Sequence, residues 1–323
     1  MKNLVVARGL TTSFEVSGQG WRRKLLHAVD HVDLEIREGE VLALVGESGS
    51  GKTTLGRSIL RLVEPSAGSV EFDGRELIGM SKQDLRLLRR DMQLIFQDPF
   101  ASLDPRMTVK QIIDEGLSIH RLGTLSERET RVFEMLQLVG LDASLSKRYP
   151  HALSGGQRQR VGIARALALR PRFIVADEAV SSLDVSAQAQ ILRLLADLRQ
   201  ALGLTMLFIT HNLNVVKMIA NRVCVMYLGK IVETGPTDLV FKSPAHPYTR
   251  LLLASVPIPN PLERSNWDLP NFEPPSGLNK PKGCAFHSRC PYAVALCENT
   301  TPHLVDAGAN RQAACFRLSE IPK

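Results

Sequence analysis

Residues 41–54 read VLALVGESGSGKTT and join an apolar run to a glycine-rich loop. The run 41–45 carries no polar side chain, as in a parallel strand that is buried on both faces. The residues after it match G-x-x-x-x-G-K-S/T, and apolar side chains at helical spacing over 52–63 predict a helix directly after the loop. A strand, a glycine loop and a helix in this order predict a phosphate-binding loop.

We expect this loop to bind a nucleotide through its backbone N–H groups and two side chains. Lys52 would reach the β- and γ-phosphates, and the Thr53 hydroxyl would bind Mg²⁺. The alternative is a glycine-serine turn that only joins two elements, and the correct flanking elements disfavour it. The predicted nucleotide-binding residues are Gly46, Glu47, Ser48, Gly49, Ser50, Gly51, Lys52, Thr53 and Thr54.

The rest of the first 240 residues alternates between strand and helix patterns. Residues 173–176 and 205–209 are further apolar runs, whereas 132–139 and 191–198 carry apolar side chains at i, i+3, i+4 and i+7. This alternation predicts an α/β core with a parallel sheet. Residues 244–281 hold nine prolines and little periodicity, so we expect an extended connector there.

The composition is that of an ordinary globular protein. The chain has 323 residues, 44% hydrophobic and 23% charged, with a net charge of +7. The surplus is spread along the chain, so we interpret it as surface solvation and expect no nucleic-acid partner. No segment predicts a membrane span or a targeting peptide. We therefore expect an intracellular chain that needs a partner to reach a membrane.

Two carboxylates follow the apolar run 173–176. Asp177, at the strand end, could hold Mg²⁺ through water, and Glu178 could orient the attacking water or accept its proton. Two acids that merely cap a turn are the alternative. A phosphate loop in the same chain favours the catalytic interpretation.

A second anion site is predicted at the sequence LSGGQ, residues 153–157. Ser154 is suited to cap a helix predicted over 157–169, and the glycines leave its first N–H groups accessible. A single nucleotide does not need two anion-binding helix ends about 100 residues apart in sequence. A nucleotide held between two subunits does.

With these motifs the sequence resembles the ATP-binding subunits of ATP-binding cassette (ABC) transporters. The family's motifs occur in order: the phosphate loop, Gln97 in LIFQDP, LSGGQ, the acidic strand end, Ser182-Leu183-Asp184, and His211. The resemblance implies an ABC-type nucleotide-binding domain over residues 1–240. It would have a mixed sheet, an antiparallel β subdomain and a helical subdomain at about 98–168. The implied activity is ATP hydrolysis coupled to translocation.

The resemblance also implies roles for single residues. Phe14 would stack on adenine, with a core phenylalanine as the alternative, and His211 would hydrogen-bond the γ-phosphate. Gln97 would contact Mg²⁺ or the attacking water and relay nucleotide occupancy to the membrane subunit, and Thr53 and Asp177 would also contact Mg²⁺. Glu178, His211 and Gln97 are thus the catalytic set. The residues that would contact ATP from the facing subunit are Ser154, Gly155, Gly156 and Gln157, with Asp184 beside them.

Two positions depart from the family pattern. Ala179 replaces the usual proline after the catalytic glutamate, and Asn212 replaces the usual aspartate after the histidine. Neither change removes a group expected to touch ATP. We predict an active site whose turnover these changes could slow.

The C-terminal part resembles the extension of dipeptide and oligopeptide importer ATPases. The matching stretches are AHPYTR at 245–250 with LLLASVPIPNP after it, and GCAFHSRCPYA at 283–293. The resemblance implies an extension over residues 241–323 and a role in peptide import. Import of nickel or another small solute is an alternative, as is a non-transport ATPase of DNA repair or regulation. The absence of heptads and of a second phosphate loop disfavours the repair class.

Four cysteines crowd into the extension: Cys284, Cys290, Cys297 and Cys315. Their spacing lacks the C-x2-C pairs of most zinc sites, and an intracellular chain disfavours disulfides. The resemblance implies a 4Fe–4S cluster that staples a tail with little core. Zn²⁺, with His287 or His303 as a substitute ligand, and unligated thiols are the alternatives. Cys224, in an apolar run, is expected to be core.

The implied partners are those of a complete importer. They are a paralogous ATPase subunit, favoured over a second copy, two transmembrane permease subunits and, indirectly, a solute-binding protein. The implied location is peripheral, on the cytoplasmic face of the bacterial plasma membrane. A redox sensor that gates transport through the cluster is a further alternative that nothing in the sequence favours.

Overall fold

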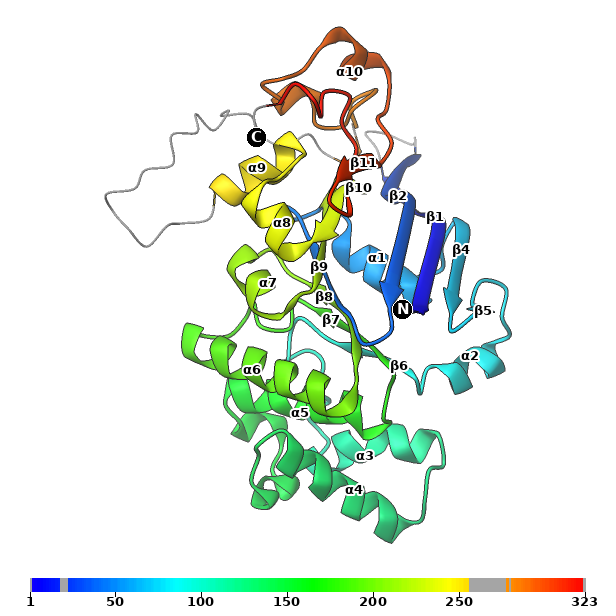
Figure 1. The fold of residues 1–323 in the computed structure, drawn as a ribbon. Helices are drawn as coiled ribbons and strands as arrows, with labels where there is room; N and C mark the ends of the chain where they lie inside the picture. Colours follow the sequence, from blue (N-terminus) through cyan, green and yellow to red (C-terminus); the bar gives the residue numbers. More distant parts are fainter. Residues whose placement is uncertain (1, 18–22, 256–276, 279, 322–323) are drawn as a thin grey trace. The chain divides into compact units, whose positions relative to one another are not determined.

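A computed structural model describes residues 2–17, 23–255, 277–278 and 280–321 (Figure 1). The chain divides into two compact units, which are described separately. The first comprises Met1–Lys2, Arg37–Glu40 and Gly79–Ile209, and the second comprises Asn3–Ile36, Val41–Ile78 and Thr210–Lys323. No helix within the described ranges is long and apolar enough to cross a membrane.

The first unit combines parallel strands with a group of helices. Strands β6, β7 and β8 pair in parallel, with Met92 opposite Phe173 and Phe173 opposite Thr205. Every residue of β7 and β8 is buried, as expected for strands whose sequences are apolar except for Asp177 and Thr205. The strands are β6 (Met92–Ile95), β7 (Phe173–Asp177) and β8 (Thr205–Ile209).

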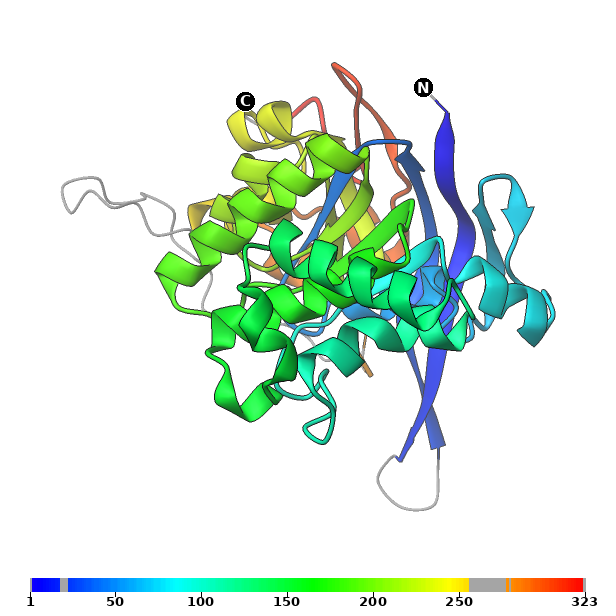
Figure 2. The ribbon, with the colours of Figure 1, turned by 90° about the horizontal axis from the view of Figure 1, so that it is seen from below.

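Side-chain caps define where most of the helices of this unit begin. Thr108, Thr124 and Ser154 each form a capping box, and Asp184 caps the helix after β7. Helices α3, α4 and α5 pack against one another, as the teal and green helices of Figure 2 show. The elements are α2 (Lys82–Leu88), α3 (Val109–Ile119), α4 (Leu125–Leu138), α5 (Gly155–Ala168), α6 (Val185–Leu202) and the short 3₁₀ turns Ala143–Lys147 and Pro150–Ala152.

The second unit contains two groups of strands. The first is a four-stranded sheet in the order β2-β1-β4-β5, with antiparallel pairs β1–β4 and β4–β5. In the second, β3 pairs in parallel with β9, and β10 lies antiparallel to both β9 and β12. The strands are β1 (Asn3–Ser17), β2 (Arg23–Arg37), β3 (Val41–Val45), β4 (Ala67–Phe72), β5 (Arg75–Glu76), β9 (Arg222–Tyr227), β10 (Lys230–Pro236), β11 (Val305–Gly308) and β12 (Arg311–Ala313).

The C-terminal segment, which comprises the described residues from 241 onward, is part of this unit's core. Strand β12 pairs with β10, and Tyr248 and Phe286 are buried in one cluster with Val45 and Tyr227. The helices of the unit are α1 (Lys52–Ile59), α7 (Leu213–Ile219), α8 (Thr237–Lys242), α9 (Pro247–Ala254) and α10 (Ala295–Asn299), with a 3₁₀ turn at His287–Arg289.

The predicted α/β architecture with a mixed sheet and a helical part is confirmed. The apolar runs 41–45, 173–176 and 205–209 are buried parallel strands, and Cys224 is a core residue, 2% exposed. The extended connector predicted over 244–281 is wrong at its start, where α9 forms. Pro247 suits the first helical position, and His246 caps the helix through its ring. Residues 256–276 and 279 of that prediction lie outside the described residues.

Candidate functional site

Two glycines of the phosphate loop, Gly46 and Gly51, are required by its shape. Their φ angles are 154° and 106°, and a Cβ at either position would lie 2.1 Å from a backbone oxygen, that of Met226 or Ala28. No other residue type fits such a close approach. The loop is therefore curled tightly between β9 and β2, in the conformation that a phosphate cradle needs.

Helix α1 begins directly after the loop, and its N-terminus is suited to bind an anion. No side chain caps its N-terminus, and its first turn contains no acid. Lys52 is 5% exposed, and its ammonium donates hydrogen bonds to the carbonyl oxygens of Gly46 at 2.9 Å and Glu47 at 2.8 Å. A buried cation beside a helix N-terminus gives the loop a positive potential.

Glu47 faces the C-terminal segment through its backbone and its side chain. Its N–H donates to the Tyr248 hydroxyl at 2.9 Å, and its carboxylate accepts two hydrogen bonds from Arg289, both at 3.0 Å. Burial, together with the charge of Glu47, raises the pKa of Tyr248, so the hydroxyl stays neutral. No sequence spacing signals these contacts, because Arg289 lies 242 residues away along the chain.

The acidic strand end in the first unit brings Gln97 and Glu178 together. The Gln97 amide Nε2 donates to Glu178 Oε2 at 2.9 Å, and Asp177, at the end of β7, is 1% exposed. Glu178 has a φ of 45°, a left-handed conformation that is uncommon for a residue with a side chain. Such backbone strain costs about 1–3 kcal/mol and tends to occur at functional sites.

The turn after Glu178 forms although Ala179 occupies the position where the family usually has proline. The Ser181 N–H and hydroxyl both donate to the Glu178 carbonyl oxygen at 3.0 Å, and Ala179 is 1% exposed. Asn212 caps α7, its Oδ1 accepting from the Asn214 N–H at 3.1 Å. Asparagine and aspartate are comparable helix caps, so this departure changes a charge and keeps the cap.

The LSGGQ sequence at 153–157, called the signature sequence below, leads into α5 as predicted, and the helix begins two residues earlier than expected. The Ser154 hydroxyl accepts from the Gln157 N–H at 3.2 Å, and the Gln157 side chain accepts from the Ser154 N–H at 3.0 Å. A Cβ on Gly155 or Gly156 would lie 3.5–3.6 Å from Leu183 or Ala187, an ordinary contact. The packing of this unit therefore does not require glycine at either position.

Asp184 lies beside this helix start and caps α6. Hydrogen bonds from the backbone of Ala187 and the side chain of Ser186 lower its pKa. In the second unit, Phe14 lies on β1 and is 38% exposed, so the alternative of a core phenylalanine is wrong. His211 is exposed and belongs to the second unit, two residues before α7 begins at Leu213.

The four C-terminal cysteines are free thiols, three of them half-buried and Cys297 buried. Burial raises the pKa of Cys290 to about 11, and the neighbouring Cys315, Cys284 and Cys297 contribute to this shift. The Cys284 N–H donates to the Cys297 carbonyl oxygen at 2.8 Å, so these two cysteines lie side by side. Within the described residues, no group of three or more His, Cys, Asp or Glu side chains is arranged to hold a metal ion.

The metal-stapled extension expected from the sequence is therefore not supported. Apolar burial and strand pairing hold the segment instead. Phe286 is 2% exposed against Tyr227 and Tyr248, and Thr234 of β10 pairs with Gln312 of β12. The sequence patterns missed this core because its members are scattered over more than 200 residues.

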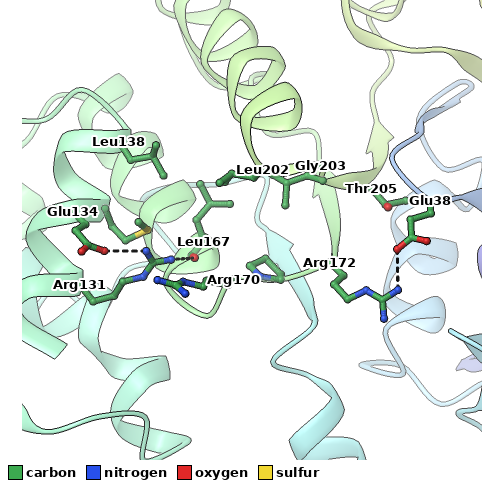
Figure 3. Close-up of a pocket in the computed structure, with 13 residues that line it drawn as sticks. Glu38, Arg131, Glu134, Leu138, Leu167, Arg170, Arg172, Leu202, Gly203 and Thr205 are labelled. Carbon is green, nitrogen blue, oxygen red and sulfur yellow. Dashed lines mark hydrogen bonds and ion pairs between the residues drawn. The ribbon is translucent and has the colours of Figure 1, made fainter. Parts of the chain in front are cut away.

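A pocket of about 660 Å³ lies in the first unit, lined in part by residues of α4, α5 and α6 (Figure 3). Two of its arginines make other contacts: Arg131 donates to the carbonyl oxygens of Leu167 and Ala168 at the end of α5, and Arg172 pairs with Glu38. None of the predicted nucleotide-binding residues that the structure describes lines it. We interpret the pocket as a structural feature of this unit.

Comparison with known proteins confirms the family resemblance that the motifs indicate. Residues 29–181 match the family model "ABC transporter", and residues 232–297 match "Oligopeptide/dipeptide transporter, C-terminal region". A putative peptide import ATP-binding protein of Brucella ovis is 50% identical over 314 residues, covering 97% of this chain and 98% of that protein. The oligopeptide transport ATP-binding protein AppF of Bacillus subtilis is 44% identical over 324 residues, 98% of each chain.

Solved structures of similar fold are also found. The dimeric post-hydrolysis structure of the ATP-binding cassette MJ0796, bound to ADP and Pi, has a TM-score of 0.65 and 31% identity. The likeness covers 72% of this chain and 98% of that one.

Proposed function

The chain belongs to the ABC transporter ATP-binding family, and on that premise we propose that it hydrolyses ATP to energise the import of di- or oligopeptides through a membrane permease. The peptide assignment is supported by the match of residues 232–297 to the oligopeptide/dipeptide transporter region. Relatives named for peptide import match along nearly the whole chain, which favours peptides over nickel and over a role in DNA repair. The observation that carries the catalytic part is the contact between Gln97 and Glu178 at the buried strand end.

In this proposal the phosphate loop binds the triphosphate. The loop N–H groups other than those of Glu47 and Ser50, which donate to Tyr248 and Glu47, face the phosphate oxygens together with the start of α1. Lys52 moves its hydrogen bonds from the loop carbonyls to the β- and γ-phosphates. Phe14, exposed on β1, stacks on adenine. His211 donates to the γ-phosphate.

Glu178 acts as the general base in hydrolysis. Its carboxylate orients the attacking water and accepts a proton from it, while the hydrogen bond from Gln97 holds Oε2 in place. The hydroxyl of Thr53, the Asp177 carboxylate and the Gln97 amide are oxygen donors, which fit Mg²⁺. When bound, Mg²⁺ neutralises charge on the β- and γ-phosphates.

The signature residues Ser154, Gly155, Gly156 and Gln157 contact ATP bound to a facing subunit, with Asp184 beside them. The support is that the chain's own packing leaves space for a Cβ at both glycines. Such small residues are expected where another molecule approaches the backbone closely. Binding of ATP thus brings two ATP-binding subunits together, and hydrolysis of ATP lets them separate.

We further propose a heteromeric importer with one paralogous ATPase subunit and two permease subunits, on the cytoplasmic face of the membrane. Co-expression with the permease subunits and the paralogous ATPase, followed by native mass spectrometry, tests this composition. One copy of this chain per complex supports the heterodimer, whereas two copies contradict it.

For the four cysteines we propose a 4Fe–4S cluster, with Zn²⁺ as the alternative. Four neighbouring free thiols support it, although their side chains would have to reorient to form a ligand set. Anaerobic purification followed by visible absorption and by iron and zinc analysis decides between the two. A colourless, metal-free protein with intact ATPase activity would rule out both.

Glu178→Gln tests the catalytic proposal in the assembled complex. We expect ATP turnover to fall by about 10²-fold or more, because the amide cannot accept the proton, and ATP binding to persist. Glu129→Gln, which removes an acid on the exposed face of α4, is the matched control and should leave turnover unchanged. Turnover by Glu178→Gln at the wild-type rate would refute the assignment.

A further inference from the structure

A salt bridge between Glu47 and Arg289 joins the phosphate loop to the C-terminal segment. Arg289 Nη1 lies 3.0 Å from Glu47 Oε2, and Nη2 lies 3.0 Å from Oε1, which is the two-pronged geometry of the strongest arginine–carboxylate pairs. The Arg289 side chain is 9% exposed and that of Glu47 is 28% exposed. This pair is therefore shielded from water far better than an ordinary surface pair.

Aromatic rings surround the arginine. Its guanidinium carbon lies 6.0 Å from the centre of the Tyr227 ring and 5.7 Å from that of Phe286. Tyr248 packs on both rings, at 4.5 and 5.4 Å between ring centres. Apolar walls strengthen the attraction between opposite charges, but they also make an unpaired charge costly.

Every polar group of Glu47 has a partner. Its N–H donates to Tyr248, its carbonyl accepts from Lys52, and its carboxylate accepts from Arg289. A carboxylate inside a phosphate-binding loop would repel the phosphates of ATP. The ion pair with Arg289 neutralises the carboxylate charge. It also keeps the Glu47 side chain oriented toward the C-terminal segment.

We propose that Arg289 is a positioning residue for the phosphate loop: by holding Glu47 from the C-terminal segment, it sets the affinity of the loop for ATP. The proposal rests on the proposed role of the loop in binding ATP. Arg289 ends the 3₁₀ turn His287–Arg289 and directly precedes Cys290. The conformation of the cysteine-containing residues 284–315 would therefore affect the affinity of the loop for ATP.

Double-mutant analysis of ATP binding to the purified full-length chain tests this coupling. Arg289→Gln leaves the carboxylate unpaired beside the phosphates, so we expect the Kd for ATP to rise about tenfold. Adding Glu47→Gln removes the repelling charge, and the double variant should recover about threefold or more of that loss. Such recovery would not follow if Arg289 only supported the fold.

Two outcomes would overturn the proposal. One is a Kd for Arg289→Gln equal to that of the wild type. The other is a double variant that binds ATP no better than Arg289→Gln alone. If Arg289→Gln does not fold, Arg289→Lys replaces it; a single ammonium contact in place of two should raise the Kd about threefold, and an unchanged Kd would again overturn the proposal.

Two controls separate this inference from the proposed function. Arg317→Gln removes another arginine of the same segment, one that pairs with Glu320, and should leave the Kd for ATP unchanged. Lys52→Ala should abolish ATP binding. If it does not, the proposed nucleotide site is wrong; if it does while Arg289→Gln binds normally, only the role of Arg289 is wrong.

Discussion

At the scale of single residues, the glycines of the two anion-binding motifs differ in what requires them. Gly51 has a φ of 106°, and its absent Cβ would lie 2.1 Å from the Ala28 oxygen. Gly156 is helical, and a Cβ there would meet Ala187 at 3.6 Å. The fold demands the first glycine, whereas only a bound molecule could demand the second.

Gly156→Ala should therefore separate stability from activity. Alanine has a higher helix propensity, by about 1 kcal/mol, so the free energy of unfolding should stay equal or rise. ATP turnover of the assembled complex should fall at least about tenfold, because the methyl group obstructs the approach of ATP from the facing subunit. Denaturant titration and ATPase assays measure the two effects.

Gly51→Ala provides the comparison for that variant. It should lose about 2 kcal/mol or more of stability through strain and overlap. Full ATPase activity in Gly156→Ala would show that no ligand needs the space at the start of α5.

His246 makes stability depend on pH. Its ring accepts a hydrogen bond from the Tyr248 N–H at 3.0 Å, and complete burial lowers its pKa from 6.5 to about 3. Between these pH values the unfolded chain binds a proton that the folded chain does not. Stability should therefore fall on acidification below pH 6.5, by up to about 1.4 kcal/mol per pH unit.

His246→Asn should flatten this pH dependence while keeping a cap on α9. Nearby Glu233 acts in the opposite direction, because burial raises its pKa above 4.5 and the folded chain then keeps a proton that the unfolded chain releases. Both proteins contain Glu233, so the difference between their denaturation curves from pH 7 to pH 4 isolates His246. Parallel curves would contradict the prediction.

At the scale of elements, α5 is defined at both ends by side chains. Ser154 and Gln157 cap its start, and Arg131 of α4 donates from Nε and Nη2 to the Ala168 and Leu167 oxygens at its end. A cation at a helix C-terminus also interacts favourably with the helix dipole. The helix that carries the signature sequence is thus held by the neighbouring helix α4.

Arg131→Ala should destabilise the first unit by about 1.5–3 kcal/mol, the usual contribution of hydrogen bonds to a charged group. Glu134→Gln removes only the pair with Arg131 on a half-exposed surface, and should cost less than about 1 kcal/mol. Equal losses in urea denaturation would mean that the ion pair, and not the helix cap, is the source of stability.

At the scale of the whole molecule, the C-terminal segment is integrated into the second unit. Its strand β12 pairs with β10, its Phe286 is buried, and its Arg289 holds the phosphate loop. A tail with so few apolar residues cannot form a separate core. It completes the core of the unit to which it belongs.

A chain that ends at Ser255 should consequently be less stable by about 3 kcal/mol or more, since it loses a buried phenylalanine and a paired strand. Phe286→Leu, which keeps most of the buried volume, should lose about 1.5 kcal/mol or less. Thermal denaturation and ATP binding measure the effects. A truncated chain as stable as the full one would mean that the segment is an independent appendage.

Local patterns were sufficient to predict the buried parallel runs 41–45, 173–176 and 205–209, and the motifs. Buried parallel strands have unbroken apolar sequences, and a phosphate loop needs glycines at particular positions, so both can be recognised from neighbouring residues alone. The helix at Pro247–Ala254 was missed because surrounding prolines suggested extended chain, although one of them suits a helix start. The fit of the cysteines to a metal could not be judged from their spacing, which does not determine side-chain directions.

By itself, then, the sequence determined the fold class, the family and the order of the nucleotide motifs, because each of these depends on residues close together along the chain. Only the tertiary structure showed how strand pairing and apolar burial hold the C-terminal segment, and which of its residues contacts the phosphate loop. The pairing of Glu47 with Arg289 spans 242 positions. No local periodicity records such a contact, because it exists only when the strands and the aromatic core bring both side chains to one place.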